Sequence, residues 1–338
     1  MGGMKAGIKD KESKQERRQV LVTGLRPSAN LHIGNYLGAV KPMLTAIDAY
    51  PDAEVFMFVA DIHGLTDSTP EIVKKYRFEV VKDYLALGLN AKRVNLYIQS
   101  DIAGELSYLT LILARHTTFN DLMRVPTLKD KLKVNQDAGQ ANALLGYYPL
   151  LMAADVLIHK GTMVPVGEDQ QAHLEKMREF GEKFNNEFSK VFPMPQPHAM
   201  KTLRILGIKG EGKMSKSHPE GAIFLTDSAD VIKKKISRAE TATEGEMTPS
   251  LESLLTVATE FGMDITEFKK EHMAGKQVIG GFKKALGERL AEFVAEFQTK
   301  RAKITDEEVM RVIALGAVSA KLSAERTMQE ALHAMKFN

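Results

Sequence analysis

The chain has 338 residues, of which 44% are hydrophobic, and it contains no cysteine. This length exceeds what one hydrophobic core usually needs and predicts two domains, while the lack of cysteine excludes disulfides, thiolate metal sites and cysteine nucleophiles. The formal net charge of +3 permits a nucleic-acid partner without requiring one, because a basic face can be hidden in a balanced total.

The first 18 residues mix acidic and basic side chains and contain few apolar ones. We expect residues 1–18 to form a disordered charged extension, because they lack both the apolar stretch of a signal peptide and the acid-poor composition of a transit peptide. No apolar run in the sequence approaches the length that crosses a membrane. Together with the absence of cysteine, this predicts a cytoplasmic location.

Strand-like and helix-like patterns alternate in the first third of the chain. Strands are predicted where apolar residues run without a break, and helices where apolar residues recur every three or four positions. One helix is well delimited, because Thr69 suits its N-cap, Pro70 its first position and Gly88 its end. The predicted order is strand 19–24, helix 33–50, strand 54–60, helix 70–87 and strand 94–98.

This alternation predicts an α/β fold with a doubly wound, Rossmann-like parallel sheet. In such a sheet, ligands bind beyond the carboxyl ends of the strands. His32, Asp61 and His63 all follow predicted strands closely. We therefore expect these three residues to gather at that edge.

The rest of the chain is predicted to be mainly helical. Helical spacing without new strands marks an insertion at about 101–160, whereas a late strand is predicted at 203–206 and a loop at 210–218. These patterns predict a Rossmann-like domain over 19–222 and a helical domain over 223–338, whose last helix packs back on the first domain. Amphipathic helices of the second domain are predicted at 251–261, 282–297 and 306–335.

Polar residues surround the turn from the first predicted strand to the first predicted helix. Free amides and the positive end of the helix dipole attract phosphate there, and Gly34 would let a nucleotide approach the backbone. His32 could donate a hydrogen bond to phosphate oxygens. An ordinary strand-to-helix turn is the alternative, and the local motif alone favours it. The candidate residues are Arg26, Pro27, Ser28, His32, Gly34 and Asn35.

An acidic residue, Asp155, lies one turn beyond Met152 in an apolar helical stretch that begins near Tyr148. A carboxylate in such a stretch is expensive to bury without a hydrogen-bond donor. The donor could be a protein group, which makes Asp155 a satisfied core residue, or it could be the N–H of a ligand. The stretch by itself favours the first alternative.

Another polar cluster comprises Gly167, Glu168, Asp169 and Gln170. Gly167 can bring the backbone close to a ligand, and the carboxylates and the amide could bind ribose hydroxyls. The same residues could equally form the acidic start of a helix over 171–184. The local sequence does not separate these two interpretations.

The segment Lys213–Ser217 places two ammonium groups and two hydroxyls in a loop without apolar periodicity. Two cations that close on one ligand indicate a polyphosphate, although a Lys/Ser loop alone is usually a solvated turn. Residues 207–213 also match the first seven positions of a P-loop. That alternative is disfavoured, because Met214 occupies the Ser/Thr position and Pro219 opposes an immediate helix.

A protein-held metal ion is not predicted. Asp61 and His63 could form a metal pair, but no matching ligand spacing occurs elsewhere, and iron–sulfur clusters and structural zinc are not expected without cysteine. Isolated histidines are expected to be structural, and these are His116, His159 and His173.

The motifs His32-Ile33-Gly34-Asn35 and Lys213–Ser217 resemble the two signatures of the class I aminoacyl-tRNA synthetases, which are written HIGH and KMSKS. The runs 23–39, 148–157 and 164–170 are similar in particular to the bacterial tryptophanyl-tRNA synthetases. The resemblance covers roughly residues 20–238 with specific motifs, and beyond them it rests on helical character.

The tyrosyl-tRNA synthetases are the nearest competitor. They share the fold and the acid at Asp155, but they usually have Gln-Ala-Tyr before it, where this chain has Met152-Ala153-Ala154. Asn35 also replaces the second histidine of their first signature. Ala29 or Asn30, where the family often has glycine, and Thr127, where bacterial relatives carry a glutamine, depart from the tryptophanyl pattern.

The resemblance implies a two-step transfer of tryptophan to tRNA(Trp) through tryptophanyl-adenylate, with ATP and Mg²⁺ held mainly by the phosphates. It implies that Lys213, Lys216, His32 and Asn35 are catalytic. Asp155 would accept the indole N–H in a tryptophan pocket shared with Met152, Tyr148, His63 and Gln170. ATP would contact Arg26, Pro27, Ser28, Gly34, Asn35, Gly167, Glu168, Asp169, Ile205, Lys213, Met214, Ser215, Lys216 and Ser217.

The helical C-terminal part is implied to bind the anticodon, with Lys233, Lys234, Lys235 and Arg238 as candidate phosphate contacts. A solvated helix face is at least as good an explanation of these charges. The insertion implies a homodimer interface. A non-catalytic tRNA-binding paralogue and a non-synthetase nucleotidyltransferase of the same fold remain as alternatives.

Overall fold

The computed structural model describes residues 19–28, 30–125, 128, 142–167, 171–200, 202–210 and 212–337. The predicted charged extension, 1–18, lies outside the described residues. So do five residues named above, which are Ala29, Thr127, Glu168, Asp169 and Gln170.

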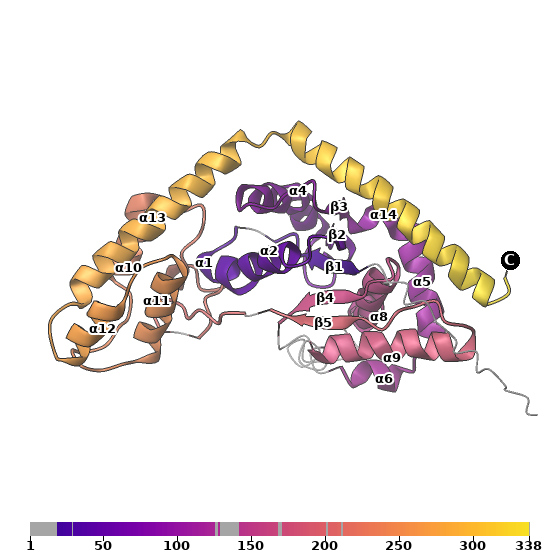
Figure 1. Cartoon of the computed structure of the whole chain (residues 1–338), viewed down its shortest axis with the longest axis horizontal. Helices are drawn as coiled ribbons and strands as arrows, with labels where there is room; N and C mark the ends of the chain where they lie inside the picture. The colour runs from indigo at the N-terminus through magenta and orange to yellow at the C-terminus, as the bar shows by residue number, and fades with distance from the viewer. Residues whose placement is uncertain are drawn as a thin grey trace, which may run out of the picture.

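A five-stranded parallel sheet forms the centre of the molecule (Figure 1). The strands lie in the order β3-β2-β1-β4-β5, and Leu21 of β1 pairs with Val55 on one side and Met163 on the other. This arrangement confirms the predicted α/β fold with a doubly wound parallel sheet. The strands are β1 (Val20–Leu25), β2 (Glu54–Val59), β3 (Asn95–Ile98), β4 (Met163–Val166) and β5 (Gln196–Ala199).

Alternate residues of each strand enter two different hydrophobic layers. In β2, Val55 and Met57 pack on one side, whereas Phe56 and Phe58 pack on the other. The sequence of β2 is nearly all apolar because both of its faces are covered. The first layer includes α2 (Lys41–Asp48) and α4 (Pro70–Ala86), and the second includes α5 (Ala103–Arg115), α8 (Ala143–Leu157) and α9 (Gln171–Glu187).

The predicted early helices are confirmed, with one interruption. Thr69 Oγ1 accepts the Ile72 amide at the start of α4, and Gly88 follows the helix with φ +107°, which favours glycine. The helix expected at 33–50 is divided by a π-helical turn. Its parts are α1 (Ile33–Asn35), η1 (Tyr36–Val40) and α2.

The strand predicted at 203–206 is wrong. Leu206 makes only an isolated antiparallel bridge to Lys213, its amide donates to Ser253 Oγ of α11 at 2.9 Å, and Ile205 accepts the Met214 amide at 2.8 Å. The backbone of this segment therefore bonds to the following loop and to α11 (Pro249–Glu260) instead of to the sheet. The last strand, β5, and its neighbour β4 were not predicted as strands.

Two long helices span the molecule at an open angle (Figure 1). The first of them lies above the other C-terminal helices, and the second lies above the sheet. The Lys321 side chain of the second helix is ion-paired with Glu105 of α5 at 2.6 Å. The two long helices are α13 (Ile279–Lys303) and α14 (Asp306–Ala334), and the other C-terminal helices are α10 (Ala229–Ser237), α11 and α12 (Thr266–Met273).

Helix α14 covers the edge strand β3 at close range. A Cβ on Gly316 would lie only 1.9 Å from the Leu96 carbonyl oxygen, so a glycine is needed where the helix crosses the strand. An exposed strand edge can pair with another chain, and α14 prevents this at β3. Among the described residues, no helix is long and apolar enough to cross a membrane.

Candidate active site

Two neighbouring cavities open at the carboxyl end of the sheet. One has a volume of about 380 Å³ and lies between the ends of β1 and β2 and the helices α8 and α9. The other has a volume of about 410 Å³ and lies between residues 26–28, the start of α1 and the loop 213–216. Arg26 lines both cavities, so segments more than 100 residues apart in the sequence meet here.

The first cavity is mainly apolar and contains most of the residues expected to bind an aromatic side chain. His63, Tyr148, Met152 and Asp155 all line it. The His63 and Tyr148 rings meet edge to face, with 5.6 Å between their centroids. His173 of α9, expected to be merely structural, also lines this cavity, and it lies edge to face against Tyr148 at 5.9 Å.

Asp155 is the buried acid of this cavity, with 2% of its surface exposed. Burial raises the pKa of Asp155 well above its usual range, hydrogen bonds from Gln99 oppose that rise, and the charge of Asp61 adds to it. Gln99 Nε2 donates to Asp155 Oδ1 at 2.7 Å and to Oδ2 at 2.9 Å. Sequence reasoning missed Gln99, although it directly follows β3 and the rule applied to His63 would have identified it.

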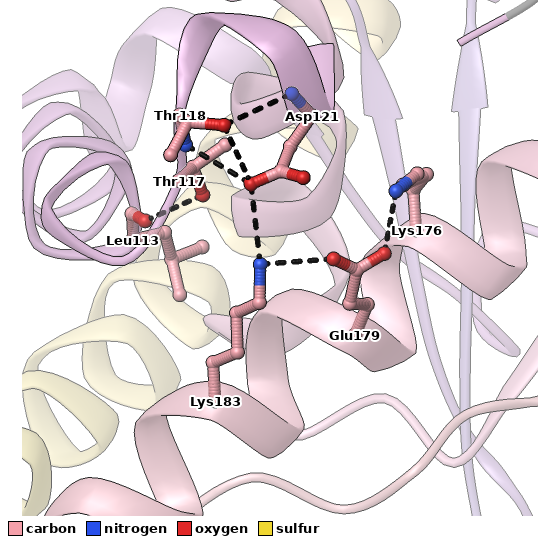
Figure 2. A network of polar contacts seen from close by, with 7 residues as sticks. All are labelled: Leu113, Thr117, Thr118, Asp121, Lys176, Glu179 and Lys183. Carbon is pink, nitrogen blue, oxygen red and sulfur yellow. Dashed lines mark hydrogen bonds and ion pairs between the residues drawn. The ribbon is translucent and has the colours of Figure 1, made fainter. Parts of the chain in front are cut away.

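Helix α6 (Phe119–Met123) and helix α9 are joined by a network of polar side chains (Figure 2). Helix α9 supplies His173 to the cavity. Lys183 of α9 is ion-paired with Glu179 at 2.9 Å and reaches Asp121 of α6 at 3.5 Å. Asp121 in turn accepts the Thr118 hydroxyl and amide at 2.9 and 3.1 Å. This network ties one wall of the cavity to the predicted insertion.

His32 and Asn35 form a reciprocal pair at the start of α1. The Asn35 amide donates to His32 Nδ1 at 3.1 Å, and the His32 amide donates to Asn35 Oδ1 at 3.2 Å. Burial, assisted by the charges of Lys216 and Lys213, lowers the pKa of His32 to about 4. The ring is therefore neutral near pH 7, and because Nδ1 accepts, its proton is on Nε2, which is left as a donor.

The loop with the two lysines begins in a tight turn. Leu206 and Lys213 face each other in an antiparallel bridge, and Gly210 and Gly212 between them have φ values of +76° and +58°. A short 3-10 turn, η4 (Pro219–Gly221), follows in place of the long helix that a P-loop requires. The P-loop alternative is therefore excluded by the local geometry.

Lys216 bridges the loop and the first motif. Its Nζ donates to Ser28 Oγ at 2.9 Å. Burial lowers the pKa of Lys216 to about 8, with a smaller contribution from the Arg26 charge, while Asp83 acts in the opposite direction. Arg26 is itself ion-paired with both oxygens of Asp67, at 2.5 and 2.6 Å. The second cavity is thus bounded by cations and hydroxyls.

Gly34 lies where the first motif packs against the loop. A Cβ at this position would meet His32 Nδ1 at 3.1 Å and Met214 Cβ at 3.2 Å. A glycine is therefore explained by the packing of α1 against Met214, which is a second reason besides the approach of a nucleotide. Gly34, Gly167, Ile205 and Ser217 line neither cavity.

The described residues contain no group of three or more His, Asp or Glu side chains that could hold a metal ion. Asp61, considered above as a metal ligand, uses its carboxylate on protein donors. It accepts the Ser100 hydroxyl at 2.6 Å, the Ser100 amide at 3.0 Å and the Ile62 amide at 2.9 Å. Asp61 therefore joins the turns that follow β2 and β3.

The sheet order, the two cavities and the cationic loop define a nucleotide-dependent enzyme of the class I synthetase type. The model of the family described as tRNA synthetases class I (W and Y) matches residues 14–312. The chain belongs to this family, whose members are specific for tryptophan or tyrosine.

The relatives identify the branch of the family. The tryptophan–tRNA ligase of Caldanaerobacter subterraneus subsp. tengcongensis is 36% identical over 322 residues, which cover 91% of this chain and 95% of that protein. That of Helicobacter pylori is 35% identical, covering 93% and 97%. The structure of Campylobacter jejuni tryptophanyl-tRNA synthetase complexed with ADP and tryptophan is 31% identical, has a TM-score of 0.79, and is matched over 94% of this chain and 100% of that one. The predicted resemblance to the bacterial tryptophanyl enzymes is confirmed.

Proposed function

We infer that this chain attaches L-tryptophan to tRNA(Trp) in two steps. The tryptophan carboxylate attacks the α-phosphorus of ATP, which forms tryptophanyl-adenylate and releases pyrophosphate. A terminal ribose hydroxyl of the tRNA then attacks the adenylate carbonyl, and AMP leaves. One observation carries this inference. An apolar cavity lined by Asp155 adjoins a second cavity lined by Lys213 and Lys216, and Arg26 lines both.

The first cavity suits the indole of tryptophan. Its volume of about 380 Å³ is in the usual range for a small-ligand site, and its lining is apolar apart from a few polar groups. Asp155 would accept the indole N–H, while Tyr148 and Met152 shape the pocket and His63 lies beside it. Phenylalanine would leave the buried Asp155 acceptor unpaired, which disfavours its activation.

The second cavity suits the ATP phosphates. Lys216, Lys213 and the His32 Nε2–H supply donors, and Ser28 and Asn35 are beside them. The attacking carboxylate is already an anion, so the site needs to orient the reactants and stabilise charge more than to remove a proton. No carboxylate among the described residues lines this cavity, so we propose that Mg²⁺ is held by the phosphate oxygens. Gly167 and Ile205 remain candidates for the nucleoside end.

The helical part, residues 223–338, is the proposed anticodon reader. A groove of about 510 Å³ lies between α10 and α13, and Lys233 and Lys234 of the predicted basic cluster line it. Lys235 is excluded from a phosphate role, because its Nζ donates to Asp227 at 2.8 Å and to the Ala222 carbonyl at 2.7 Å. The lysines that line the groove are Lys233, Lys234, Lys283 and Lys284. Lys283 already donates to the Ala239 carbonyl at 2.7 Å, which leaves Lys233, Lys234 and Lys284 as the candidate phosphate contacts.

A homodimer and a cytoplasmic location belong to the same proposal. Large apolar side chains on α5 and α6, in the predicted insertion, are exposed to solvent. A second copy that covers them would remove this apolar surface from water. The exposed side chains are Tyr108, Leu111, Phe119 and Met123.

Pyrophosphate exchange into ATP, measured with each amino acid, tests the function directly. Exchange with tryptophan alone is expected, whereas a non-catalytic paralogue would give none and a different nucleotidyltransferase would not depend on tryptophan. Asp155→Ala is expected to lower kcat/KM for tryptophan by roughly 5- to 150-fold, because the indole N–H is left without an acceptor in a buried pocket. The KM for ATP is the internal control, and an equal effect on both substrates contradicts the assignment of Asp155.

A further inference from the structure

The buried glutamine Gln99 stands between the end of the sheet and the acid of the first cavity. It is the first residue of the 3-10 turn η2 (Gln99–Ile102), which follows β3, and it is 0% exposed. It does not line the cavity, but its amide touches Asp155, the only carboxylate among the described residues that line it. Gln99 can therefore affect a ligand in the cavity through its hydrogen bonds to Asp155.

The orientation of the Gln99 amide is determined by its two neighbours. Its Oε1 accepts the backbone N–H of His63 at 3.0 Å, and its Nε2 donates to both Asp155 oxygens, at 2.7 and 2.9 Å. The reversed amide would place an oxygen against the carboxylate and an NH₂ group against an N–H. Both contacts would be repulsive, so only the observed orientation satisfies the hydrogen-bonding groups.

The turn that carries Gln99 is itself fixed on two sides. The Ile98 amide donates to Asp101 Oδ2 at 2.9 Å, and the Ser100 hydroxyl donates to Asp61 Oδ2 at 2.6 Å. Asp61 opens α3 (Asp61–Gly64), the same short helix that offers the His63 amide to Gln99. Gln99 is therefore held by the ends of two adjacent strands before any substrate arrives.

A buried carboxyl group has two states with opposite recognition properties. The ionised form only accepts hydrogen bonds, whereas the protonated form also carries an O–H donor. Burial favours the protonated form of Asp155, and a hydrogen bond donated to the carboxylate favours the ionised form. The Gln99 amide supplies that donor and also fixes the plane of the carboxylate.

We propose that Gln99 is the specificity-determining positioning residue of the tryptophan pocket, because it holds Asp155 as an oriented acceptor for the indole N–H. This inference rests on the proposed function. It predicts that the ability to distinguish N–H from an isosteric group without a donor depends on Gln99, which never touches the substrate itself.

The test compares tryptophan with β-(benzothiophen-3-yl)alanine, in which sulfur replaces the indole N–H at nearly unchanged shape. Pyrophosphate exchange gives kcat/KM for each amino acid, and the ratio of the two values is the readout. Wild type is expected to favour tryptophan by roughly 100-fold or more, because a site built around a hydrogen bond rejects an analogue that lacks it. Gln99→Met, similar in length but without an N–H, is expected to reduce this ratio at least tenfold.

Tyr97→Phe is the matched control. Tyr97 lies two residues earlier in β3, is also 0% exposed, and loses one buried hydrogen bond, that of its hydroxyl with His159 at 2.8 Å. A purely structural role of Gln99 would lower kcat/KM for both amino acids by the same factor, as we expect of Tyr97→Phe. An unchanged ratio in Gln99→Met therefore overturns the proposal.

A second variant covers the case in which Gln99→Met does not fold. Gln99→Asn keeps the amide but withdraws its nitrogen by about 1.5 Å, one carbon–carbon bond, and is expected to lower the ratio in the same direction. Turnover of the sulfur analogue shows that a variant is folded. If wild type does not activate tryptophan, the proposed function fails. If it does, and both Gln99 variants keep the wild-type ratio, only the role of Gln99 fails.

Discussion

The pH dependence of ATP use should depend on Lys216. Burial lowers its pKa to about 8, and its ammonium group lies in the cavity that we assign to the phosphates. A lysine with this pKa is roughly 90% charged at pH 7 and roughly 10% charged at pH 9, whereas an ordinary lysine stays almost fully charged over this range. If only the ammonium form supports adenylate formation, kcat/KM for ATP should fall about tenfold between these pH values.

Pyrophosphate exchange at saturating tryptophan, from pH 6.5 to 9.5, provides the profile. We expect the falling limb of kcat/KM for ATP to have its midpoint near pH 8. The limb of kcat should lie at higher pH, because bound ATP anions stabilise the ammonium form of Lys216. Lys216→Arg should lack the limb, since arginine stays protonated, although its different geometry lowers the absolute rate.

Lys213→Arg, which replaces the other lysine of the loop, is the control for Lys216→Arg. Lys213 lines the same cavity but is exposed, so its replacement should leave the midpoint near pH 8. A limb that persists in Lys216→Arg would show that another group titrates. The assignment of the low pKa to Lys216 would then be refuted.

Two further predictions concern stability and tRNA binding. Burial lowers the pKa of His159 to about 3, so the stabilising contribution of the neutral ring is fully present above the unfolded pKa of about 6.5 and is lost as pH falls. The free energy of unfolding should therefore drop by about 2 to 3 kcal/mol between pH 7 and 4.5. Urea unfolding of His159→Gln should show a correspondingly flatter pH dependence. The groove between α10 and α13 should contribute to the salt dependence of tRNA binding, with the log–log slope falling by roughly 2 when three of its lysines are replaced by glutamine. The replaced lysines are Lys233, Lys234 and Lys284, and a slope that stays at the wild-type value would contradict a role of the groove in tRNA binding. The control is the same replacement of Lys269, Lys270 and Lys276, which lie on or just after α12 and outside the groove.

The sheet could be predicted only in part. The strands β1, β2 and β3 are covered on both faces, so their apolar runs are unambiguous. The strand β5 reads Gln196-Pro197-His198-Ala199, which no pattern of apolar residues distinguishes from a loop. It is a strand because it pairs with β4 in register, and such pairing is set by tertiary contacts.

The opposite error occurred at residues 203–206. Their apolar pattern is that of a strand, and Ile205 is indeed buried, but their hydrogen bonds go to α11 and to the following loop. Burial alone determines the apolar composition of a segment. The partners of its backbone determine whether it is a strand, and these are not local in sequence.

The class of chemistry could be predicted from the sequence. Each local motif alone favours an ordinary turn, but the motif at His32–Asn35 and the loop Lys213–Ser217 together resemble the two signatures of one family of enzymes. Such motifs are contiguous in the chain, so the resemblance could be recognised without a structure. Which side chains contact one another could not be predicted from the sequence and depends on the packing of the fold. Gln99 joins Asp155 across 56 positions, Lys216 joins Ser28 across 188, and Lys235 is withdrawn from the basic face by Asp227. A hydrogen bond depends on distances of about 3 Å and on direction, and those are set only when the strands and helices are packed together.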